Sequence, residues 1–343
     1  MSASPDAPRY RGALIGLGGI GRSGHLPAYD HADIAPRLEL TATVDALPGT
    51  APAGAIPLVA RHDALDARAL DFVDICTPTA SHVDLAVWAL GSGLHVLCEK
   101  PVAIRRRDAL RIAEAARRAG RIVMPCHQYR HNPVWRQIRM WLDDGRIGRW
   151  HLAEFQVYRP TADRGAATTG VPWRGRRAHG LGGVLLDHGT HLIYQLLDVA
   201  GPPRAVRAWT GVLSHGEYDV EDTAQLTLDF DGRLGTMFLT WAGHKRETRI
   251  RFIGDRGMID WTGGTLTLES DGASESRDWS AMLDKRSYAG WYVSLLREFT
   301  EAMDAGDGER HLADIAAVAG VLEDAYASAG AAAPESRPLT SVA

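Results

Sequence analysis

A glycine-rich turn directly after the first apolar segment constrains this chain more than any other feature. Residues 12–17 form a short apolar strand, and Gly16, Gly18 and Gly21 fit the pattern G-x-G-x-x-G. In such a turn the first glycine permits a tight bend, the second lets a pyrophosphate approach the backbone, and the third lets a helix pack on the strand. The helix N-terminus then offers free N–H groups to the phosphates. We therefore predict that Gly16, Gly18, Gly19, Ile20 and Gly21 bind a dinucleotide. Because the chain has 36 glycines, the pattern alone is also compatible with an ordinary glycine-rich turn.

The second predicted strand supports the dinucleotide interpretation. Residues 38–44 are followed by Asp45, whose carboxylate is placed to accept hydrogen bonds from a ribose, although a plain turn residue is the alternative. No Lys or Arg occurs between Asp45 and Arg61, so nothing nearby in the sequence would bind a 2′-phosphate. This favours NAD over NADP. FAD is disfavoured because we see no second flavin motif.

Strand and helix signals alternate through the first third of the chain. Further strands are predicted over residues 72–77, 95–98 and 121–124, and helices over 83–90 and 108–119. Such alternation predicts an α/β fold with a parallel, doubly wound sheet. Residues 47–57 are rich in Pro, Gly and Ala, so we expect a shortened or looped connection there.

After about residue 125 the pattern changes to mostly period-two strands. Strands are predicted over residues 152–158, 205–212, 224–230, 234–241, 248–253 and 265–269. Helices are predicted over residues 133–143, 181–197, 292–303 and 312–322. We predict an α+β second domain with a large, mostly antiparallel open sheet. The predicted boundaries are 1–125 for the dinucleotide-binding domain, 126–330 for the second domain and 331–343 for a loose tail.

Composition narrows the class of protein. The chain has 343 residues, of which 45% are hydrophobic and 23% are charged, as is typical of a globular protein. Its formal net charge of −4 lacks the excess of basic residues that nucleic-acid binding usually requires. Residues 1–10 contain no apolar core of a signal peptide, and no apolar run is long enough to span a membrane. Cys76, Cys98 and Cys126 are odd in number and widely spaced, so we expect free thiols, no metal pattern and a cytoplasmic location.

Lysine is rare in this chain. Of 38 basic residues only Lys100, Lys245 and Lys285 are lysines, so a lysine is a candidate for chemistry that arginine cannot perform, although an ordinary surface role is the alternative for each. Lys100 follows Glu99 at the end of the fourth predicted strand, and the carboxyl ends of such strands face the cofactor crevice.

Two further segments are candidates for the same cofactor crevice at the carboxyl ends of the strands. Thr77 and Pro78 end the third predicted strand, where they either contact the cofactor or form a strand-ending turn. His82 either contributes to the cofactor site or is a helix-start residue without a role.

A second cluster of chemically versatile residues follows a glycine-rich run. Asp187 and His191 are four residues apart, so on a helix they share one face, where a carboxylate can orient an imidazole. A structural Asp–His pair is the alternative. Asp187, His188 and His191 are also metal-ligand types, but their spacing does not match H-E-x-x-H and no cysteine accompanies them, so we predict no metal.

In this order and spacing, these segments resemble the glucose–fructose oxidoreductase, inositol dehydrogenase and MocA (Gfo/Idh/MocA) family over nearly the whole chain. The resemblance rests on Gly16–Gly21, Asp45, Cys76-Thr77-Pro78 with His82, Glu99-Lys100-Pro101, Tyr129-Arg130 with Asn132-Pro133, Trp173-Arg174, and the run to Asp187 and His191. It implies a Rossmann domain followed by a domain whose open sheet builds homodimers or homotetramers.

The resemblance also implies the roles of individual residues. Lys100, Asp187 and His191 would form a catalytic trio, in which Lys100 hydrogen-bonds the reacting hydroxyl and His191 is the general acid/base. Asp187 would orient His191 or contact substrate, and Glu99 would assist near the ribose, so Glu99 and Lys100 join the predicted cofactor contacts. The substrate pocket would be lined by Lys100, Arg130, Tyr158, Trp173, Arg174, Asp187, His188 and His191.

The predicted function is NAD-dependent hydride transfer to or from a secondary alcohol or ketone of a cyclitol, sugar or sugar derivative. Two alternatives stay open at this point. One is an enzyme that keeps NAD bound and uses transient oxidation to cleave a glycosidic bond, and the other is a non-catalytic NAD-binding sensor on the same fold.

Overall fold

A computed structural model describes residues 8–47, 50, 53–163, 170–284 and 288–335 of the chain. The chain divides into two compact units. The first unit consists of Met1–Gln128, Ala289–Ala316 and Glu335–Ala343, and the second consists of Tyr129–Tyr288 and Ala317–Pro334. Residues 336–343 of the predicted tail lie outside the described residues.

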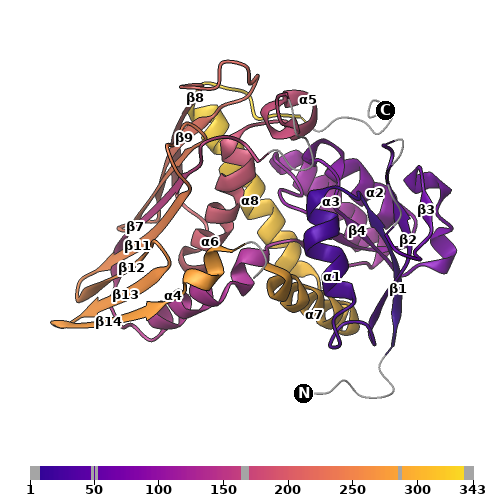
Figure 1. The fold of residues 1–343 in the computed structure, drawn as a ribbon, viewed down its shortest axis with the longest axis horizontal. Helices are drawn as coiled ribbons and strands as arrows, with labels where there is room; N and C mark the ends of the chain where they lie inside the picture. Colours follow the sequence, from indigo (N-terminus) through magenta and orange to yellow (C-terminus); the bar gives the residue numbers. More distant parts are fainter. Residues whose placement is uncertain (1–7, 48–49, 51–52, 164–169, 285–287, 336–343) are drawn as a thin grey trace. The chain divides into compact units, whose positions relative to one another are not determined.

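The first unit contains a six-stranded sheet in the order β3-β2-β1-β4-β5-β6, in which all neighbouring strands are parallel (Figure 1). This confirms the predicted doubly wound sheet. The order places β2 on one side of β1 and β4 on the other, so the crevice for a ligand is expected at the carboxyl ends of β1 and β4. The strands are β1 (Tyr10–Ile15), β2 (Leu38–Val44), β3 (Leu58–Val59), β4 (Phe72–Ile75), β5 (His95–Cys98) and β6 (Val123–Pro125).

Helices of the first unit lie between these strands. They are α1 (Leu26–Tyr29), α2 (His82–Gly91) and α3 (Arg106–Ala119). The last of them buries Ile112 and Ala116 while its arginines remain outward, and it ends at Gly120 in the left-handed conformation that glycine tolerates best. The periodicity that predicted α2 and α3 therefore reflects their packing on the sheet.

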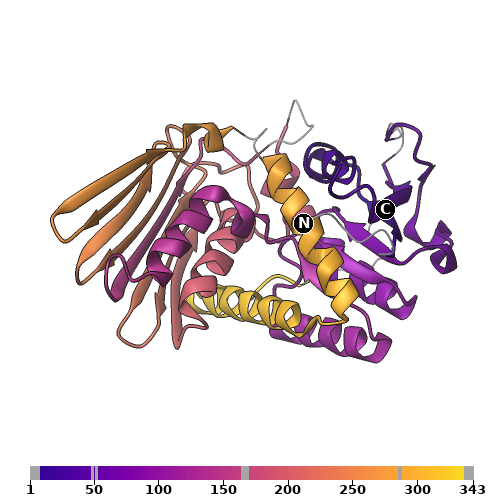
Figure 2. The same ribbon diagram turned by 90° about the horizontal axis from the view of Figure 1, so that it is seen from below.

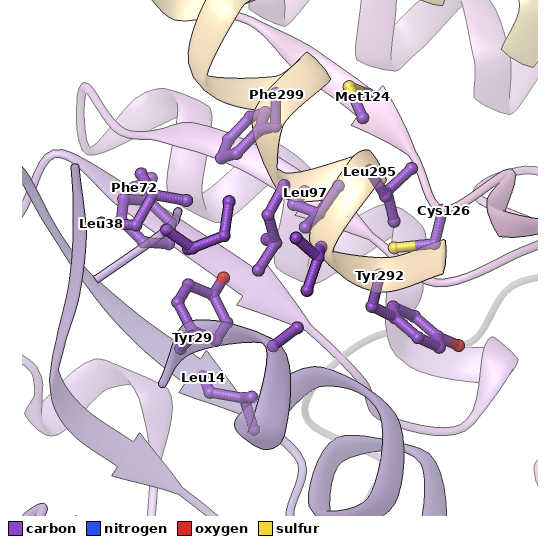
Figure 3. Close-up of a cluster of buried hydrophobic side chains, with 14 of the residues drawn as sticks. Leu14, Tyr29, Leu38, Phe72, Leu97, Met124, Cys126, Tyr292, Leu295 and Phe299 are labelled. Carbon is purple, nitrogen blue, oxygen red and sulfur yellow. The ribbon is translucent and has the colours of Figure 1, made fainter. Parts of the chain in front are cut away.

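Helix α7 (Ala289–Ala305) belongs to the first unit, although the predicted boundaries assigned residues 126–330 to the second domain. Its apolar side packs into the core of the parallel sheet, where the rings of Phe299 and Phe72 lie 5.7 Å apart at 78° (Figure 3). Figure 3 also shows Leu295 of this helix beside Leu97 of β5 and Cys126. A parallel sheet must be covered on both faces, and α1 has only four residues, so a helix from the far end of the chain completes that cover.

The second unit is built on an eight-stranded sheet in the order β14-β13-β12-β11-β7-β10-β9-β8. Every neighbouring pair is antiparallel except β10 and β7, which confirms the predicted mostly antiparallel sheet. The strands are β7 (Trp150–Tyr158), β8 (Ala205–Gly211), β9 (Thr223–Asp229), β10 (Leu234–Thr240), β11 (Glu247–Gly254), β12 (Gly257–Thr262), β13 (Thr265–Ser270) and β14 (Ala273–Asp278).

Among the described residues, helices cover one face of this sheet and no helix covers the other. Figure 2 shows α4 (Pro133–Asp143) and α6 (Thr190–Ala200) on the covered side. The short helix α5 (Arg177–Gly180) belongs to the same unit, and α8 (Glu309–Ser328) contributes residues to both units. Along β7 the buried side chains of Ala153, Phe155 and Val157 alternate with more exposed ones, as expected for a sheet with one solvated face. Within the described ranges, we find no helix that combines the length and the apolar character needed to cross a membrane.

Candidate active site

The turn after β1 has the geometry that a bound dinucleotide requires. Gly16 has a φ of +104°, and a Cβ there would lie 2.7 Å from the carbonyl carbon of Cys76. A Cβ at Gly21 would collide with the Gly16 carbonyl oxygen, whereas at Gly18 and Gly19 it would have no heavy atom within 4 Å. The outer glycines are therefore required by crowding, and the backbone of the middle two is open to a ligand. This is the arrangement that admits a pyrophosphate.

Asp45 lies against this turn. Its Oδ2 accepts a hydrogen bond from the Leu17 N–H at 2.8 Å, and its Oδ1 accepts one from the Leu47 N–H at 2.9 Å. The carboxylate is thereby fixed beside the open glycines, at the end of β2 where a ribose is expected. Arg61, the first cation that follows Asp45 in the sequence, pairs with Asp63 at 2.7 Å.

The end of β4 is joined to the end of β5 through His82. Its Nε2 lies 2.8 Å from the Thr77 carbonyl oxygen and its Nδ1 lies 2.8 Å from that of Pro101. Burial lowers the pKa of His82, so the ring is neutral and donates to one of the two carbonyls. Ser81 Oγ donates to Thr77 Oγ1 at 2.7 Å. The structure thus gives His82 a role in fixing the strand ends that carry Thr77 and Pro78, and its cofactor contact stays a prediction.

Glu99 directly follows β5, and both of its carboxylate oxygens have hydrogen-bond partners. Oε1 lies 3.1 Å from His25 Nε2 and accepts from the Tyr292 hydroxyl at 3.1 Å, while Oε2 accepts from the Lys100 N–H at 3.1 Å. Burial alone would raise the pKa of Glu99, but the hydrogen bond and charge of His25 and the charge of Lys100 outweigh it and lower that pKa. Lys100 follows directly, and its peptide bond to Pro101 is cis.

His25 connects Glu99 to a second buried carboxylate. Its Nδ1 lies 2.7 Å from Asp74 Oδ2, both side chains have no exposed surface, and Tyr29 donates to the same oxygen at 2.9 Å. Burial would lower the pKa of His25, but the charge of Asp74 outweighs it and raises that pKa well above its ordinary value. We call His25, Asp74 and Glu99 the buried network. Sequence reasoning missed His25 and Asp74, although a carboxylate inside the apolar strand β4 signals a buried partner.

One group of residues in the described part of the chain has metal-ligand geometry. Ligand atoms of His25, Asp74 and Cys126 lie within 4.8 Å of one another. However, the two ring nitrogens of His25 face carboxylates, and burial raises the pKa of the Cys126 thiol, which keeps it protonated. The hydrogen-bonded network therefore accounts for this group without an ion.

The second unit presents Asp187 and the two histidines at the start of a helix. Residues Leu185–Gly189 form a π-helical turn that leads into α6, and the helix begins at residue 184 rather than at the predicted 181. The backbone of Glu221 anchors this start by accepting from the Val184 N–H at 3.0 Å. A side chain at Gly183 would collide with the same carbonyl, which explains part of the glycine-rich approach. Single π-turns inside helices occur frequently at functional sites.

Asp187 lies between two basic side chains. Its Oδ1 accepts from Arg174 Nε at 3.2 Å, and its Oδ2 lies 3.2 Å from His188 Nδ1. The Arg174 guanidinium stacks 4.3 Å from the Trp173 ring, and Trp241 Nε1 lies 3.4 Å from His188 Nδ1. The structure therefore brings together Trp173, Arg174, Asp187 and His188, four of the residues predicted to bind substrate.

His191 lies one turn further along and is held by tyrosines. Its Nδ1 is 2.9 Å from the Tyr194 hydroxyl, and its ring lies 4.3 Å from the Tyr129 ring between centroids. Arg130 stacks 5.7 Å from the Tyr194 ring, and its Nε lies 3.6 Å from Asp198 Oδ1. Arg130 is therefore close to the residue that holds His191. Sequence reasoning missed Tyr194, which the i,i+3 spacing from His191 could have suggested.

Tyr158 lies on the other face of the second unit's sheet from α6. It alternates with the buried residues of β7, and its ring lies 5.7 Å from that of Phe238 on the open face of the sheet. Leu239, which alternates with Phe238, faces the helix start instead, since a Cβ at Gly189 would lie 3.3 Å from its side chain. The pleat therefore directs Tyr158 away from the face that carries α6, and its contact with a substrate stays a prediction.

The next residue, Arg159, is a feature that sequence reasoning missed. The residue is 9% exposed, and its guanidinium donates to the carbonyl oxygens of Tyr158 and Glu247 and to Thr248 Oγ1. Burial and the charge of Arg246 lower its pKa to about 10, while nearby groups, Asp187 among them, act in the opposite direction. Nothing in the sequence distinguishes this arginine from the many others.

Two segments of the sequence match models of known protein families. Residues 10–127 match the model of the oxidoreductase family with an NAD-binding Rossmann fold, and residues 135–260 match the GFO/IDH/MocA C-terminal domain. D-apiose dehydrogenase of Paraburkholderia graminis is 30% identical over 77% of this chain and 68% of its own length. The 1,5-anhydro-D-fructose reductase of Ensifer adhaerens is 30% identical over 59% of this chain and 62% of its own.

A solved structure is similar over almost the whole chain. Levoglucosan dehydrogenase in complex with NADH and levoglucosan matches with a TM-score of 0.81 and 20% identity, covering 94% of this chain and 97% of that one. At this level of identity the similarity shows a shared fold. It extends over both units.

Proposed function

This chain belongs to the GFO/IDH/MocA family of NAD-binding oxidoreductases, and we propose that it transfers hydride to or from a secondary alcohol or ketone of a cyclitol, sugar or sugar derivative. The observation that carries the proposal is the carboxyl edge of the parallel sheet. The open glycines follow β1 at that edge, Asp45 follows β2, and Lys100 follows β5. A cofactor turn and a lysine therefore share the edge where ligands of such sheets bind.

The residues of the first unit fit NAD. Gly16, Gly18, Gly19, Ile20 and Gly21 would hold the pyrophosphate and Asp45 the adenosine ribose, with Thr77, Pro78, His82, Glu99 and Lys100 toward the other half of the cofactor. When bound, the cofactor supplies the hydride acceptor or donor. We infer a preference for NAD over NADP, because the Asp45 carboxylate would repel a 2′-phosphate and Arg61 is paired with Asp63.

Three residues are proposed to handle the proton and the charge on the reacting oxygen. His191 accepts the proton of the substrate hydroxyl during oxidation and returns it during reduction. The ammonium group of Lys100 donates a hydrogen bond to the same oxygen and stabilises its developing negative charge. Asp187, held by Arg174 and His188, is placed to accept a hydrogen bond from a neighbouring substrate hydroxyl. Trp173 and Arg130 complete the proposed substrate contacts.

We also propose a location and an assembly. Cys76, Cys98 and Cys126 are free, buried thiols, which supports a reducing, cytoplasmic environment. The open face of the second unit's sheet exposes Trp209 (49%) and Leu234 (40%), and this supports a homodimer or homotetramer formed through that sheet.

A substrate panel tests the function. Purified protein is incubated with cyclitols, hexoses and sugar derivatives in the presence of NAD or NADP, and the absorbance of the reduced cofactor is recorded. We expect turnover with at least one member and a higher kcat/KM with NAD. Cofactor that survives gel filtration without net reduction, or an absence of turnover with every member, would contradict the proposal.

The role of His191 has its own test. His191→Ala removes the general base, so we expect kcat to fall by about 10² to 10⁴ while NAD binding is retained. Cofactor binding is measured by quenching of tryptophan fluorescence. Turnover equal to that of the wild type would contradict this assignment.

A further inference from the structure

The Tyr194 hydroxyl has hydrogen-bond partners on two sides. It accepts the backbone N–H of Tyr129 at 3.0 Å, and it lies 2.9 Å from Nδ1 of His191. A hydroxyl oxygen has two acceptor lone pairs, so it can accept from a backbone N–H and from an imidazole N–H at the same time. The backbone donor fixes the position of this oxygen, because a peptide N–H cannot move independently of the chain.

The tyrosine itself is rigidly placed. Tyr194 has no exposed surface, lies three residues after His191 in α6, and carries the Arg130 guanidinium 5.7 Å from its ring. Residues three apart on a helix are neighbours on its surface. The ring of Tyr129 lies 4.3 Å from that of His191 on another side. A hydrogen bond and a ring contact therefore restrict the rotation of the His191 imidazole.

The position of the proton on the neutral His191 ring determines whether Nε2 can act as a base. Which ring nitrogen of a neutral histidine carries the proton is set by the hydrogen bond that the other nitrogen makes. If Nδ1 donates its proton to the Tyr194 oxygen, Nε2 is unprotonated and its lone pair can accept a proton from a substrate. If Nδ1 is instead unprotonated, Nε2 carries the proton and cannot act as a base.

We infer that Tyr194 is a positioning residue for His191: its oxygen accepts the Nδ1–H, which holds the neutral ring in the tautomer whose Nε2 is the base. This inference rests on the proposed function, since it concerns the nitrogen that takes the substrate proton. Asp187 contacts Arg174 and His188. The hydroxyl that we propose sets the tautomer of His191 belongs to the same helix, α6.

The test removes only the hydroxyl. Tyr194→Phe keeps the ring, and the matched control Tyr218→Phe deletes another buried hydroxyl of the second unit, which pairs with Thr161 at 2.7 Å. Protein labelled with ¹⁵N-histidine reports the protonation of each ring nitrogen, and the His191 signals are assigned by their loss in His191→Gln. In the wild type and in Tyr218→Phe we expect a protonated Nδ1 and an unprotonated Nε2 at neutral pH. In Tyr194→Phe we expect a mixture of tautomers.

Kinetics supply the second readout. We expect Tyr194→Phe to lower kcat about ten- to hundredfold and to change the pH profile of kcat/KM, with NAD affinity unchanged. A wild-type His191 that is protonated on Nε2, or a Tyr194→Phe variant with the wild-type tautomer and pH profile, would overturn the inference. If the tautomer shifts as expected but no substrate is turned over by the wild type, the proposed function fails and the positioning role stands.

Discussion

The two units each contain an aspartate paired with a histidine, and the two pairs differ in exposure. In the first unit, His25 and Asp74 lie 2.7 Å apart with no exposed surface. In the second unit, Asp187 and His188 lie 3.2 Å apart with side chains 16% and 20% exposed. The shorter distance and complete burial make the first pair a fixed part of the interior of the first unit. The second pair keeps surface through which a ligand can be contacted.

Burial changes what the same chemical groups can do. A buried pair pays for the loss of hydration of both ions, so it persists only when each charge has its partners, as His25 has in Asp74 and Glu99. A partly exposed pair is compensated by water and remains available for binding. We therefore expect substitutions in the buried network to act first on stability, and substitutions at Asp187 and Lys100 to act first on turnover.

The largest expected effect on stability comes from Asp74→Ala. It leaves His25 buried without one of its two carboxylates, so the free energy of unfolding should fall by about 3–5 kcal/mol. Urea unfolding followed by circular dichroism measures this change. The matched control is Asp187→Ala, which breaks the other Asp–His pair and should lower stability less but reduce turnover. Equal losses of stability in the two variants would remove the distinction between the pairs.

A smaller effect is expected from Lys100→Arg, which keeps the charge at the end of β5. A guanidinium is planar and larger than an ammonium, so it cannot place a single donor at the same point, and kcat should fall at least about tenfold. The control is Lys245→Arg, since Lys245 is 74% exposed and pairs with Glu247 at 2.9 Å. Initial rates with the best substrate of the panel provide the measurement. Wild-type turnover in Lys100→Arg would show that only the charge matters.

Periodic apolar patterns allowed much of the fold to be predicted. The predicted bounds of β2, β5 and α4 agree with the structure. In α4 the reason is plain, because Val134, Ile138 and Trp141 are buried at helical spacing. Strand β14 was not predicted, since its six residues are mostly polar and exposed at the edge of the sheet. The assignment of α7 to the first unit was also missed, because its helical pattern shows that it is buried without showing which sheet it covers.

The candidate site was predictable where a motif carried it. The glycine turn, Asp45 and Lys100 follow strands, and their order in the chain indicates the sheet edge at which they lie. The partners of these residues were not predictable, because Tyr292 and His25 reach Glu99 from segments far apart in the sequence. The face on which Tyr158 lies was not predictable for a related reason, since one step along a strand exchanges the two faces of the sheet.

The smallest expected effect is a dependence of stability on pH, and it tests whether the buried network holds a charged histidine. The pKa of His25 lies well above 6.5 in the folded chain, so its contribution to stability is complete below that value and is lost as the pH rises through the folded pKa. The pKa of Glu99 lies below 4.5, so its contribution is complete above that value and is lost as the pH falls through the folded pKa. The network should therefore stabilise the chain most between about pH 4.5 and about pH 6.5, the ordinary pKa values of the two groups.

His25→Gln can hydrogen-bond but cannot bind a proton, so it isolates the titration. Melting temperatures of the wild type and the variant are compared from about pH 5 to about pH 9. The difference between them should be largest near pH 5 to 6 and should shrink steadily toward alkaline pH, because the wild type alone loses the stabilising proton. A difference that stays constant over this range would mean that His25 contributes by packing and neutral hydrogen bonds. In that case the buried network would hold a neutral histidine.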